Sequence, residues 1–339
     1  MSATTGKRLA IVGATGAVGQ EMLDCLEERN FPISELTLLA SARSAGKEIP
    51  FRGNLIKVKE LTRDSFADID IALFSAGGGI SKEFAPSAAA AGCVVIDNSS
   101  CFRMDEDVPL VVPEINPDAI KDRPRNIIAN PNCTSIITLM ALFPLHKLYG
   151  LKSIIASSYQ AVSGSGAQGI IELDEQIKVL AGGGEVTAEM KKVYPHQIAS
   201  NVIPQVDVFT DNGYTKEELK MHFESRKILG LSDLNVTCTC VRVPVHRSHC
   251  VSVTAIFNNP VDVEEARAAY TEMPGTRLVD DPSKNLYPVP LDSTKGDDCL
   301  IGRIRKDMVL ENALTLWVTG DQVRKGAALN AVQIAELVE

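Results

Sequence analysis

Short runs of apolar, β-branched residues alternate with amphipathic helical segments over the first third of the chain. Near-continuous apolar runs of this kind are typical of parallel strands that are covered on both faces. Because strand and helix alternate, the pattern predicts right-handed βαβ units and a doubly wound α/β sheet. The predicted strands are residues 8–13, 36–41, 69–76, 94–99 and 126–130, and the clearest helices are residues 17–30 and 81–92.

The pattern changes at about residue 133. A long apolar helical run is followed by alternating strands with longer connections, which predicts a second, α+β domain. The last residues again show the 3.6-residue period of an amphipathic helix. The predicted elements are a helix at 134–150, strands at 153–162, 235–245 and 250–258, and a terminal helix at 327–339.

Two domains also agree with a length of 339 residues, which exceeds the size at which one hydrophobic core keeps growing. We expect a Rossmann-type domain over residues 1–132, completed by the C-terminal segment 320–339. The inserted domain, residues 133–319, is expected to carry catalysis and dimerisation.

Composition and charge narrow the class of protein. Hydrophobic residues make up 45% of the chain and charged residues 23%, as in ordinary globular proteins. The net charge of -9 offers no basic surface for a phosphate backbone, so we expect no nucleic-acid partner. The sequence shows neither a signal peptide nor an apolar run of membrane-spanning length, so we expect a cytosolic protein without a membrane contact. Eight cysteines without disulfide or metal-ligand spacing predict reduced thiols and no metal site.

A glycine-rich loop joins the first predicted strand to the first predicted helix in AIVGATGAVGQEML. Glycines at this place let the backbone turn tightly and approach a pyrophosphate, whose charge lies at the amides of the helix N-terminus. The spacing is GxxGxxG, and an ordinary glycine turn in an unrelated α/β protein remains the alternative. The predicted cofactor-binding residues of this loop are Gly13, Thr15, Gly16, Ala17, Val18 and Gly19.

The end of the second predicted strand bears on the choice between NAD and NADP. An NAD site usually places an acidic residue there for the ribose, but the segment LLASARSAGK after this strand contains no acid, and the first one to follow is Glu48. Ser41, Arg43 and Ser44 offer hydrogen-bond donors, and a guanidinium matches a 2′-phosphate. The sequence therefore favours NADPH, with a solvated loop arginine as the alternative.

Cys133 stands where a predicted strand meets a long predicted helix, in NPNCTS. Asn132 is a suitable N-cap, and the partial positive charge of a helix N-terminus favours a reactive thiolate. An inert buried thiol is the alternative. Together with a nicotinamide, a thiolate predicts one chemistry: addition to an aldehyde, departure of hydride, and cleavage of the thioester by phosphate.

The chain resembles the aspartate-semialdehyde dehydrogenases over nearly its full length. The resemblance implies an NADP-dependent enzyme that interconverts aspartyl phosphate and aspartate semialdehyde with inorganic phosphate, in lysine, diaminopimelate, threonine and methionine biosynthesis. It also implies a homodimer or homotetramer paired through the second domain. The matching blocks, in family order, are GATGAVG, SARSAG, SSCFRMDEDVPLVVPEIN, NPNCTS, SYQAVSGSG, KEELKM, RVPVHRSH and DQVRKGAA.

This resemblance implies a role for each matching residue. Cys133 corresponds to the nucleophile, Gln160 to the residue that orients the acyl group or the attacking water, and His249 to the acid/base. Among the charged positions, Arg242 corresponds to the arginine for the substrate carboxylate and Glu217 to a residue for the amino group. Arg103 and Lys220 match a phosphate-binding pair, Ser163 and Gly164 would lie near the nicotinamide, and Gln322, where the family commonly has Asn, would reach the cofactor.

Two other functions are compatible with parts of this pattern. An N-acetyl-glutamyl-phosphate reductase shares the chemistry, but its cysteine block is closer to Pro-Gly-Cys-Tyr than to the residues Pro131 to Thr134. A non-catalytic NADPH-binding paralogue is expected to lack the nucleophile or the acid/base, and this chain has both.

Overall fold

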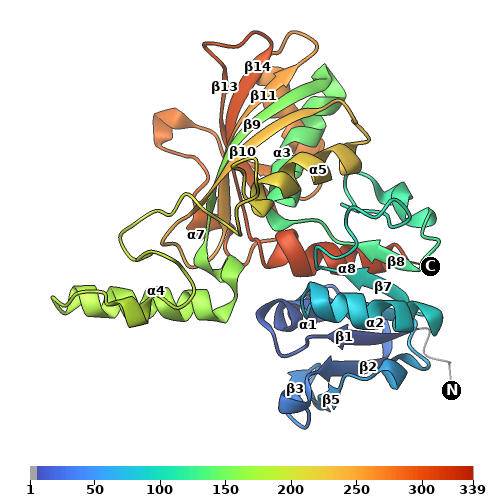
Figure 1. The fold of residues 1–339 in the computed structure, drawn as a ribbon. Helices are drawn as coiled ribbons and strands as arrows, with labels where there is room; N and C mark the ends of the chain where they lie inside the picture. Colours follow the sequence, from blue (N-terminus) through green and yellow to red (C-terminus); the bar gives the residue numbers. More distant parts are fainter. Residues whose placement is uncertain (1–5, 339) are drawn as a thin grey trace. The chain divides into compact units, whose positions relative to one another are not determined.

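The computed structural model describes residues 6–338 and divides the chain into two compact units (Figure 1). The first contains the chain up to Asn132 together with the stretch from Ala327 onward. The second is Cys133–Gly326. Within residues 6–338, no helix has the length and apolarity that crossing a membrane requires.

The first unit is built on a six-stranded parallel sheet in the order β5-β2-β1-β6-β7-β8. All five strands predicted for this part form, and the doubly wound fold is confirmed. The order reverses between β1 and β6, which is where ligands bind in sheets of this type. The strands are β1 (Lys7–Val12), β2 (Ile33–Ala40), β5 (Lys59–Glu60), β6 (Ile71–Phe74), β7 (Val94–Asp97) and β8 (Ile127–Ala129).

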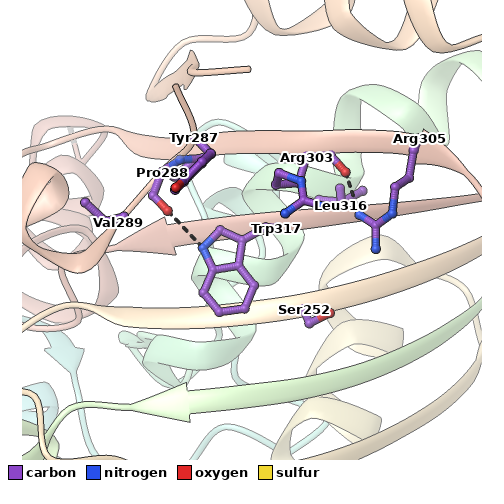
Figure 2. Close-up of a pocket in the computed structure, with 8 residues that line it drawn as sticks. All are labelled: Ser252, Tyr287, Pro288, Val289, Arg303, Arg305, Leu316 and Trp317. Atoms are coloured by element: carbon purple, nitrogen blue, oxygen red, sulfur yellow. Dashed lines mark hydrogen bonds between the residues drawn. The ribbon is translucent and has the colours of Figure 1, made fainter. Parts of the chain in front are cut away.

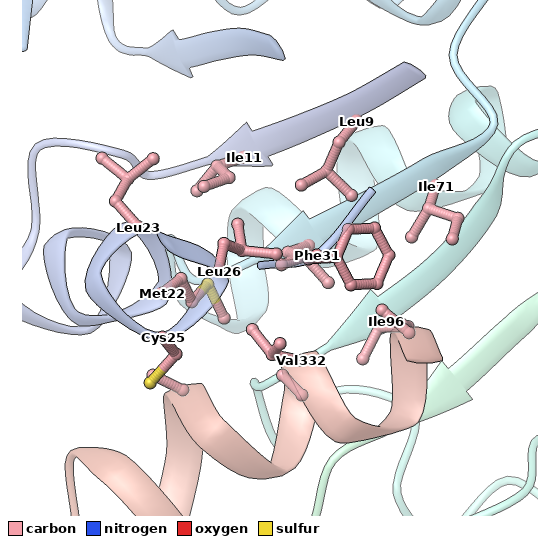
Figure 3. Packing of buried hydrophobic residues seen from close by; sticks show 14 of the residues in the cluster. Leu9, Ile11, Met22, Leu23, Cys25, Leu26, Phe31, Ile71, Ile96 and Val332 are labelled. Atoms are coloured by element: carbon pink, nitrogen blue, oxygen red, sulfur yellow. The ribbon is translucent and has the colours of Figure 1, made fainter. Parts of the chain in front are cut away.

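Helices α1 (Ala17–Glu28) and α8 (Leu329–Glu336) pack against each other and against this sheet. Figure 3 shows Leu9 of β1, Leu26 of α1 and Val332 of α8 in one apolar cluster, and all three are fully buried. Each such side chain contributes about 1.5–3 kcal/mol through burial. The C-terminal helix therefore completes the core of the first unit.

The first unit also contains one more helix and a short β-hairpin. Helix α2 (Gly78–Ala90) packs on β7, close to its predicted position. The short strands β3 (Glu48–Phe51) and β4 (Asn54–Lys57) form a hairpin that the sequence did not reveal. Their pattern is half polar and each is four residues long, so no apolar run marks them.

The second unit contains a mixed six-stranded sheet in the order β10-β9-β11-β14-β13-β12. Strands β9 and β10 run parallel, whereas β11 is antiparallel to both of its neighbours. The three strands predicted here form, and three C-terminal strands join them. The bounds are β9 (Leu151–Gln160), β10 (Asn235–Arg242), β11 (His249–Phe257), β12 (Thr276–Leu278), β13 (Cys299–Lys306) and β14 (Ala313–Gly320).

Helix α3 (Cys133–Tyr149) packs against β9, β11, β13 and β14. Its residues are buried nearly all round, which explains why it is apolar without a polar stripe. Other helices of this unit cover neighbouring parts of the sheet or extend from it. They are α4 (Ala167–Ala181), α5 (Lys216–Leu229), α6 (Val263–Glu272) and α7 (Pro290–Ser293).

Candidate active site

The glycine loop of the first unit lies at the point where the strand order reverses. Gly13 follows β1 with φ +88°, and a Cβ added there would lie 2.4 Å from the carbonyl oxygen of Ser75, just after β6. A Cβ on Gly19 would lie 2.4 Å from the Gly13 carbonyl oxygen. Both positions therefore require glycine for the close turn.

The start of α1 is open to a ligand. Gly16 is its N-cap and no side chain caps the first amides. Thr15 and Ala17 are exposed and Val18 is half-buried. An uncapped helix N-terminus beside a glycine turn, at the carboxyl ends of β1 and β6, fits a dinucleotide pyrophosphate.

The segment after β2 forms a short 3₁₀ turn, Ala42–Ser44. Ser41 and Arg43 are exposed, whereas Ser44 is buried and its amide donates to the Ser41 carbonyl at 2.8 Å. Ser41 and Arg43 thus present exposed side chains at this turn, whereas the Ser44 side chain is enclosed and its amide stabilises the turn.

Arg103 is held at the carboxyl ends of two strands of the first unit. Its guanidinium donates to the carbonyl oxygen of Asn98, after β7, at 2.8 Å and to that of Asn130, after β8, at 2.9 Å. The side chain of Asn130 in turn bonds Asn98 and Asn330 of α8. Arg103 is buried, so these bonds fix its orientation.

Three predicted residues lie in one row across the sheet of the second unit. Arg242 is the last residue of β10, Gln160 the last of β9, and His249 the first of β11. Strand register places Arg242 opposite Gln160, and His249 opposite Gly320 at the end of β14. Because β9 lies between β10 and β11, the sheet brings together residues that are far apart in sequence.

Gln160 joins this row to helix α5. Its amide nitrogen donates to Oε1 of Glu217 at 3.1 Å, and its oxygen accepts from the Ser158 hydroxyl at 3.0 Å. The same nitrogen lies 3.4 Å from Nε2 of His249. Nδ1 of His249 accepts from the backbone amide of Ala161 at 3.1 Å.

The electrostatic surroundings keep His249 uncharged. The side chain is fully buried. Burial, with the nearby Arg242 guanidinium, lowers the pKa of His249 to about 3, against an opposing effect of Glu217. The ring is therefore neutral at physiological pH.

Arg242 is buried and only part of its guanidinium is bonded within the protein. Nη1 donates to the Ala161 carbonyl at 2.6 Å, and the guanidinium lies 5.8 Å from the ring centroid of Tyr194. Its Nε is buried without a hydrogen-bond partner. A buried guanidinium with an unused donor is suited to a carboxylate.

Glu217 and Lys220 stand one turn apart at the start of α5 and form a pair, with Lys220 Nζ 2.8 Å from Glu217 Oε2. Thr215 caps this helix reciprocally with Glu218, which fixes its first turn. Burial by itself lowers the pKa of Lys220, but Glu217 and Asp207 outweigh this effect and raise it. Lys220 therefore stays cationic, as an anion site requires.

Cys133 begins α3 and is half-buried. A Cβ added to Gly326 would lie 2.8 Å from the Cβ of Cys133, so the Gly326 backbone packs directly on Cys133. One turn further along α3, Ile137 lies against Gly320, the register partner of His249. The first turn of α3 thus lies beside the row of site residues.

Ser163, Gly164 and Gln322 surround the same end of the sheet. The Gln322 amide bonds the Ser163 hydroxyl and accepts from the Ser248 amide at 2.8 Å. A Cβ on Gly164 would lie 3.0 Å from Nη1 of Arg242 and 3.2 Å from Nε2 of His249. A side chain at residue 164 would therefore crowd both groups.

Comparisons with known proteins agree with this geometry. A model of the semialdehyde dehydrogenase NAD binding domain matches residues 8–123, and one of the semialdehyde dehydrogenase dimerisation domain matches residues 142–325. The aspartate-semialdehyde dehydrogenase of Aquifex aeolicus is 51% identical over 335 residues, 98% of each chain. That of Bacillus subtilis is 48% identical over 98% of this chain and 97% of the relative.

The chain belongs to the aspartate-semialdehyde dehydrogenase family. A crystal structure of aspartate semialdehyde dehydrogenase II from Vibrio cholerae, complexed with ASA, aligns with a TM-score of 0.95 at 46% identity over 98% of both chains. The family resemblance of the sequence is thereby confirmed, and the reductase alternative is not favoured.

For this family member, the structure also identifies contacts that the sequence did not. Ala161 bonds both His249 and Arg242 through its backbone, and no side-chain pattern signals such a role. Gly326 is part of the DQVRKGAA block, but Gly326 and Cys133 are the last and first residues of the second unit, so the sequence does not reveal their contact.

All eight cysteines are thiols, and no cluster of metal-ligating side chains occurs in the described part of the chain.

Proposed function

We propose that the protein catalyses the reversible, NADPH-dependent reductive dephosphorylation of L-4-aspartyl phosphate to L-aspartate 4-semialdehyde. This reaction serves lysine, diaminopimelate, threonine and methionine biosynthesis, and we infer that it takes place in the cytosol. The observation that carries the proposal is the buried row of Arg242, Gln160 and His249, joined to Glu217 and lying beside the first turn of α3. A carboxylate-binding group, an amide and an imidazole next to a thiol are what an acyl-thioester reaction on a small amino acid needs.

Cys133 is the proposed nucleophile. Its place at the first position of a 17-residue helix exposes the thiol to the positive end of the helix dipole, which favours the thiolate. The thiolate adds to the aldehyde carbon in one direction and displaces phosphate from the acyl phosphate in the other. In both directions the acyl group is carried as a thioester on Cys133.

The substrate is held by charges of both signs. The unused Nε of Arg242 supports binding of the α-carboxylate, and Glu217 is the proposed partner of the amino group. We assign Gln160 to orientation of the acyl group, because its own bonds to Ser158 and Glu217 fix its amide. We assign His249 to acid/base catalysis, in which it takes the proton of the Cys133 thiol and returns one to the adduct.

Phosphate binding is assigned to Arg103 and Lys220. Each is buried or nearly so, and each is fixed by hydrogen bonds within its own unit. Two fixed cations stabilise a phosphate as it arrives or leaves.

The cofactor is proposed to be NADP. Gly13, Gly16 and Gly19 would hold the pyrophosphate, while Ser41 and Arg43 would hold the 2′-phosphate, because no acidic residue occupies the end of β2. When bound, the nicotinamide supplies the hydride acceptor or donor. Ser163, Gly164 and Gln322 are assigned to its surroundings.

We propose that residues 1–132 and 320–339 bind the cofactor and that residues 133–319 carry catalysis and dimerisation.

We propose that two copies pair through the face of the second sheet opposite the row of Arg242, Gln160 and His249, as a dimer or within a tetramer. Tyr159 and Trp317 lie in contact on that face, at 5.2 Å between ring centroids, and Ile155 is 45% exposed. Figure 2 shows Trp317 beside a hollow of about 310 Å³, which is lined also by Arg303 and Arg305.

A phosphate-dependent NADP reduction assay with aspartate semialdehyde tests the proposal. We expect turnover that requires phosphate, a much weaker signal with NAD, and an acyl adduct on Cys133 by mass spectrometry. The Cys133→Ser variant should lose activity. Turnover of the glutamate semialdehyde alone, or near wild-type activity of the Ser variant, would overturn it.

A further inference from the structure

Residues 191–203 of the second unit form neither a helix nor a regular strand. We call this segment the strap. Its side chains Tyr194, Ile198 and Ile203 are nevertheless buried, in an apolar cluster that also contains Leu173 of α4. A buried segment without secondary structure needs hydrogen-bond partners for its backbone from elsewhere, because unpaired buried amides are costly.

Two buried side chains of α4 supply these partners. Oε2 of Glu172 accepts from the backbone amides of residues 192–193, at 2.8 and 2.5 Å. One turn further along the helix, Oε1 of Gln176 accepts from the amides of residues 198–199, at 3.0 and 3.1 Å. The two side chains also bond each other, at 3.2 Å. Neither has a part in the reaction proposed above, and together they fix the strap on α4.

The strap carries Tyr194 to Arg242. The Tyr194 hydroxyl donates to the carbonyl oxygen of Val162 at 3.2 Å. A Cβ added to Gly169 of α4 would lie 2.6 Å from that hydroxyl oxygen, so the helix has room for the hydroxyl only because residue 169 is glycine. With its hydroxyl fixed in this way, the ring lies against the Arg242 guanidinium, whose central carbon is 5.8 Å from the ring centroid.

Arg242 is a buried cation with few other partners. Its backbone pairs with Ile203, the last residue of the strap, at 2.8 and 2.9 Å, and its Nη1 donates to the Ala161 carbonyl. No carboxylate in the part of the chain that the structure describes forms an ion pair with it. A buried charge loses its hydration and needs an interaction that offsets this loss. The face of an aromatic ring attracts a cation within about 6 Å, most strongly where both are removed from water.

We propose that Tyr194 is a positioning residue for substrate binding, because its ring orients the Arg242 guanidinium toward the substrate carboxylate. Glu172 and Gln176 serve the same purpose by holding the strap that carries the ring. This inference rests on the proposed function, in which Arg242 binds that carboxylate. Tyr194 acts through Arg242, so its loss should weaken binding of the aldehyde and leave phosphate binding and the step at Cys133 nearly unchanged.

Two substitutions at residue 194 separate the ring from the hydroxyl. Tyr194→Leu removes the ring but keeps an apolar side chain in the cluster, whereas Tyr194→Phe keeps the ring and removes only the hydroxyl. We expect the KM for aspartate semialdehyde to rise about tenfold or more in Tyr194→Leu and to stay within about threefold of the wild type in Tyr194→Phe. An unchanged KM in Tyr194→Leu, or an equal rise in both variants, would overturn the proposal.

The KM for phosphate and kcat give a readout that separates a positioning role from a general loss of structure. In Tyr194→Leu we expect both quantities to stay within about threefold of the wild type. A change of about tenfold in either quantity would overturn the proposal, because it would show a disturbance beyond the carboxylate site.

A double-variant cycle tests whether the effect of Tyr194 passes through Arg242. Tyr194→Leu should lower kcat/KM for aspartate semialdehyde about tenfold in the otherwise wild-type protein, but less than about threefold in the Arg242→Lys background. A loss of about tenfold in both backgrounds would show that Tyr194 acts independently of Arg242 and would overturn the proposal.

Glu172→Gln tests the strap without changing the ring. The substituted amide carries N–H donors and cannot accept from all of the groups that now donate to the carboxylate. Glu175→Gln is the matched control, because Glu175 lies on the same helix and is exposed. We expect the KM for aspartate semialdehyde to rise about fivefold in Glu172→Gln and to stay at the wild-type value in Glu175→Gln.

Equal KM values in Glu172→Gln and Glu175→Gln would overturn the proposal, and this pair decides also where Tyr194→Leu does not fold. Failure of the proposed function is distinguishable from failure of this inference. In the first case the wild type shows no phosphate-dependent turnover of aspartate semialdehyde. In the second case the wild type is active, and the variants at residues 194 and 172 bind the aldehyde equally well.

Discussion

Replacing Gly326 by alanine is predicted to displace Cys133, the proposed nucleophile, through a single steric contact. The added methyl carbon would lie 2.8 Å from the Cβ and 3.3 Å from the Cα of Cys133. Gly326 does not have a left-handed backbone, so alanine can adopt its φ and the effect comes from space alone. Helix propensity by itself would favour alanine.

The magnitude follows from the distance. Carbon atoms in contact are separated by about 3.5–4.0 Å, so Cys133 and residue 326 must move apart by about 1 Å. Overpacking of this kind costs about 1–3 kcal/mol of stability. A displacement of a reacting group by about 1 Å lowers the rate on the order of 100-fold. We expect the free energy of activation to rise by more than the free energy of unfolding falls, because the clash is with Cys133, the proposed nucleophile.

Steady-state NADP reduction and urea unfolding measure the two effects separately. Gly182→Ala is the matched control, because Gly182 ends α4 without a left-handed φ and an added Cβ would meet nothing closer than 3.5 Å. We expect this control to keep wild-type kcat. A Gly326→Ala protein with kcat within twofold of the wild type and unchanged stability would refute the reasoning.

Three further changes test the site and its support. Arg242→Lys keeps the charge but loses the planar fork, so the KM for aspartate semialdehyde should rise about 10- to 100-fold in steady-state assays, and an unchanged KM would place the carboxylate elsewhere. The pKa of His249 is lowered from 6.5 to about 3, so its neutral form contributes stability that is present above pH 6.5 and is lost as the pH falls toward 3. Urea unfolding from pH 8 to 4 should therefore show a steeper loss in the wild type than in His249→Gln, and parallel curves would contradict the buried neutral ring. Asp321 is fully buried and accepts from Arg247 at 2.5 Å and from backbone amides, so Asp321→Ala should lower the free energy of unfolding by about 3–5 kcal/mol in urea. Asp118→Ala, in an exposed pair, should leave it nearly unchanged. Equal effects of the two substitutions would show that burial of Asp321 is unimportant.

Five strands of the parallel sheet in the first unit could be predicted, because parallel strands covered on both faces are largely apolar. Ile71–Phe74 is buried throughout, and its sequence IALF shows this directly. The hairpin of β3 and β4 could not be found in this way, because alternate positions of the short strand Glu48–Phe51 face solvent.

Some of the candidate residues were found from local sequence, because their chemistry depends on their immediate neighbours. Cys133 at a strand-to-helix junction and Gly13 in a glycine turn each have a physical meaning within a few residues of sequence. Most other assignments, such as Arg242 and His249, came from ordered family blocks. Spacing alone does not tell whether either side chain is buried or what it contacts.

The sequence by itself determined the fold class and the glycine turn, and it indicated Cys133 as the candidate thiol, because these follow from local hydrophobic pattern and backbone geometry. Only the tertiary structure decided the burial and the contacts of His249 and the space around Cys133. Ala161 follows β9 and His249 begins β11, so their contact depends on the pairing of these two neighbouring antiparallel strands. Gly326 and Cys133 are in contact although they are nearly 200 residues apart in sequence. Such contacts depend on strand register and close packing of distant segments, and neither leaves a periodic signal along the chain.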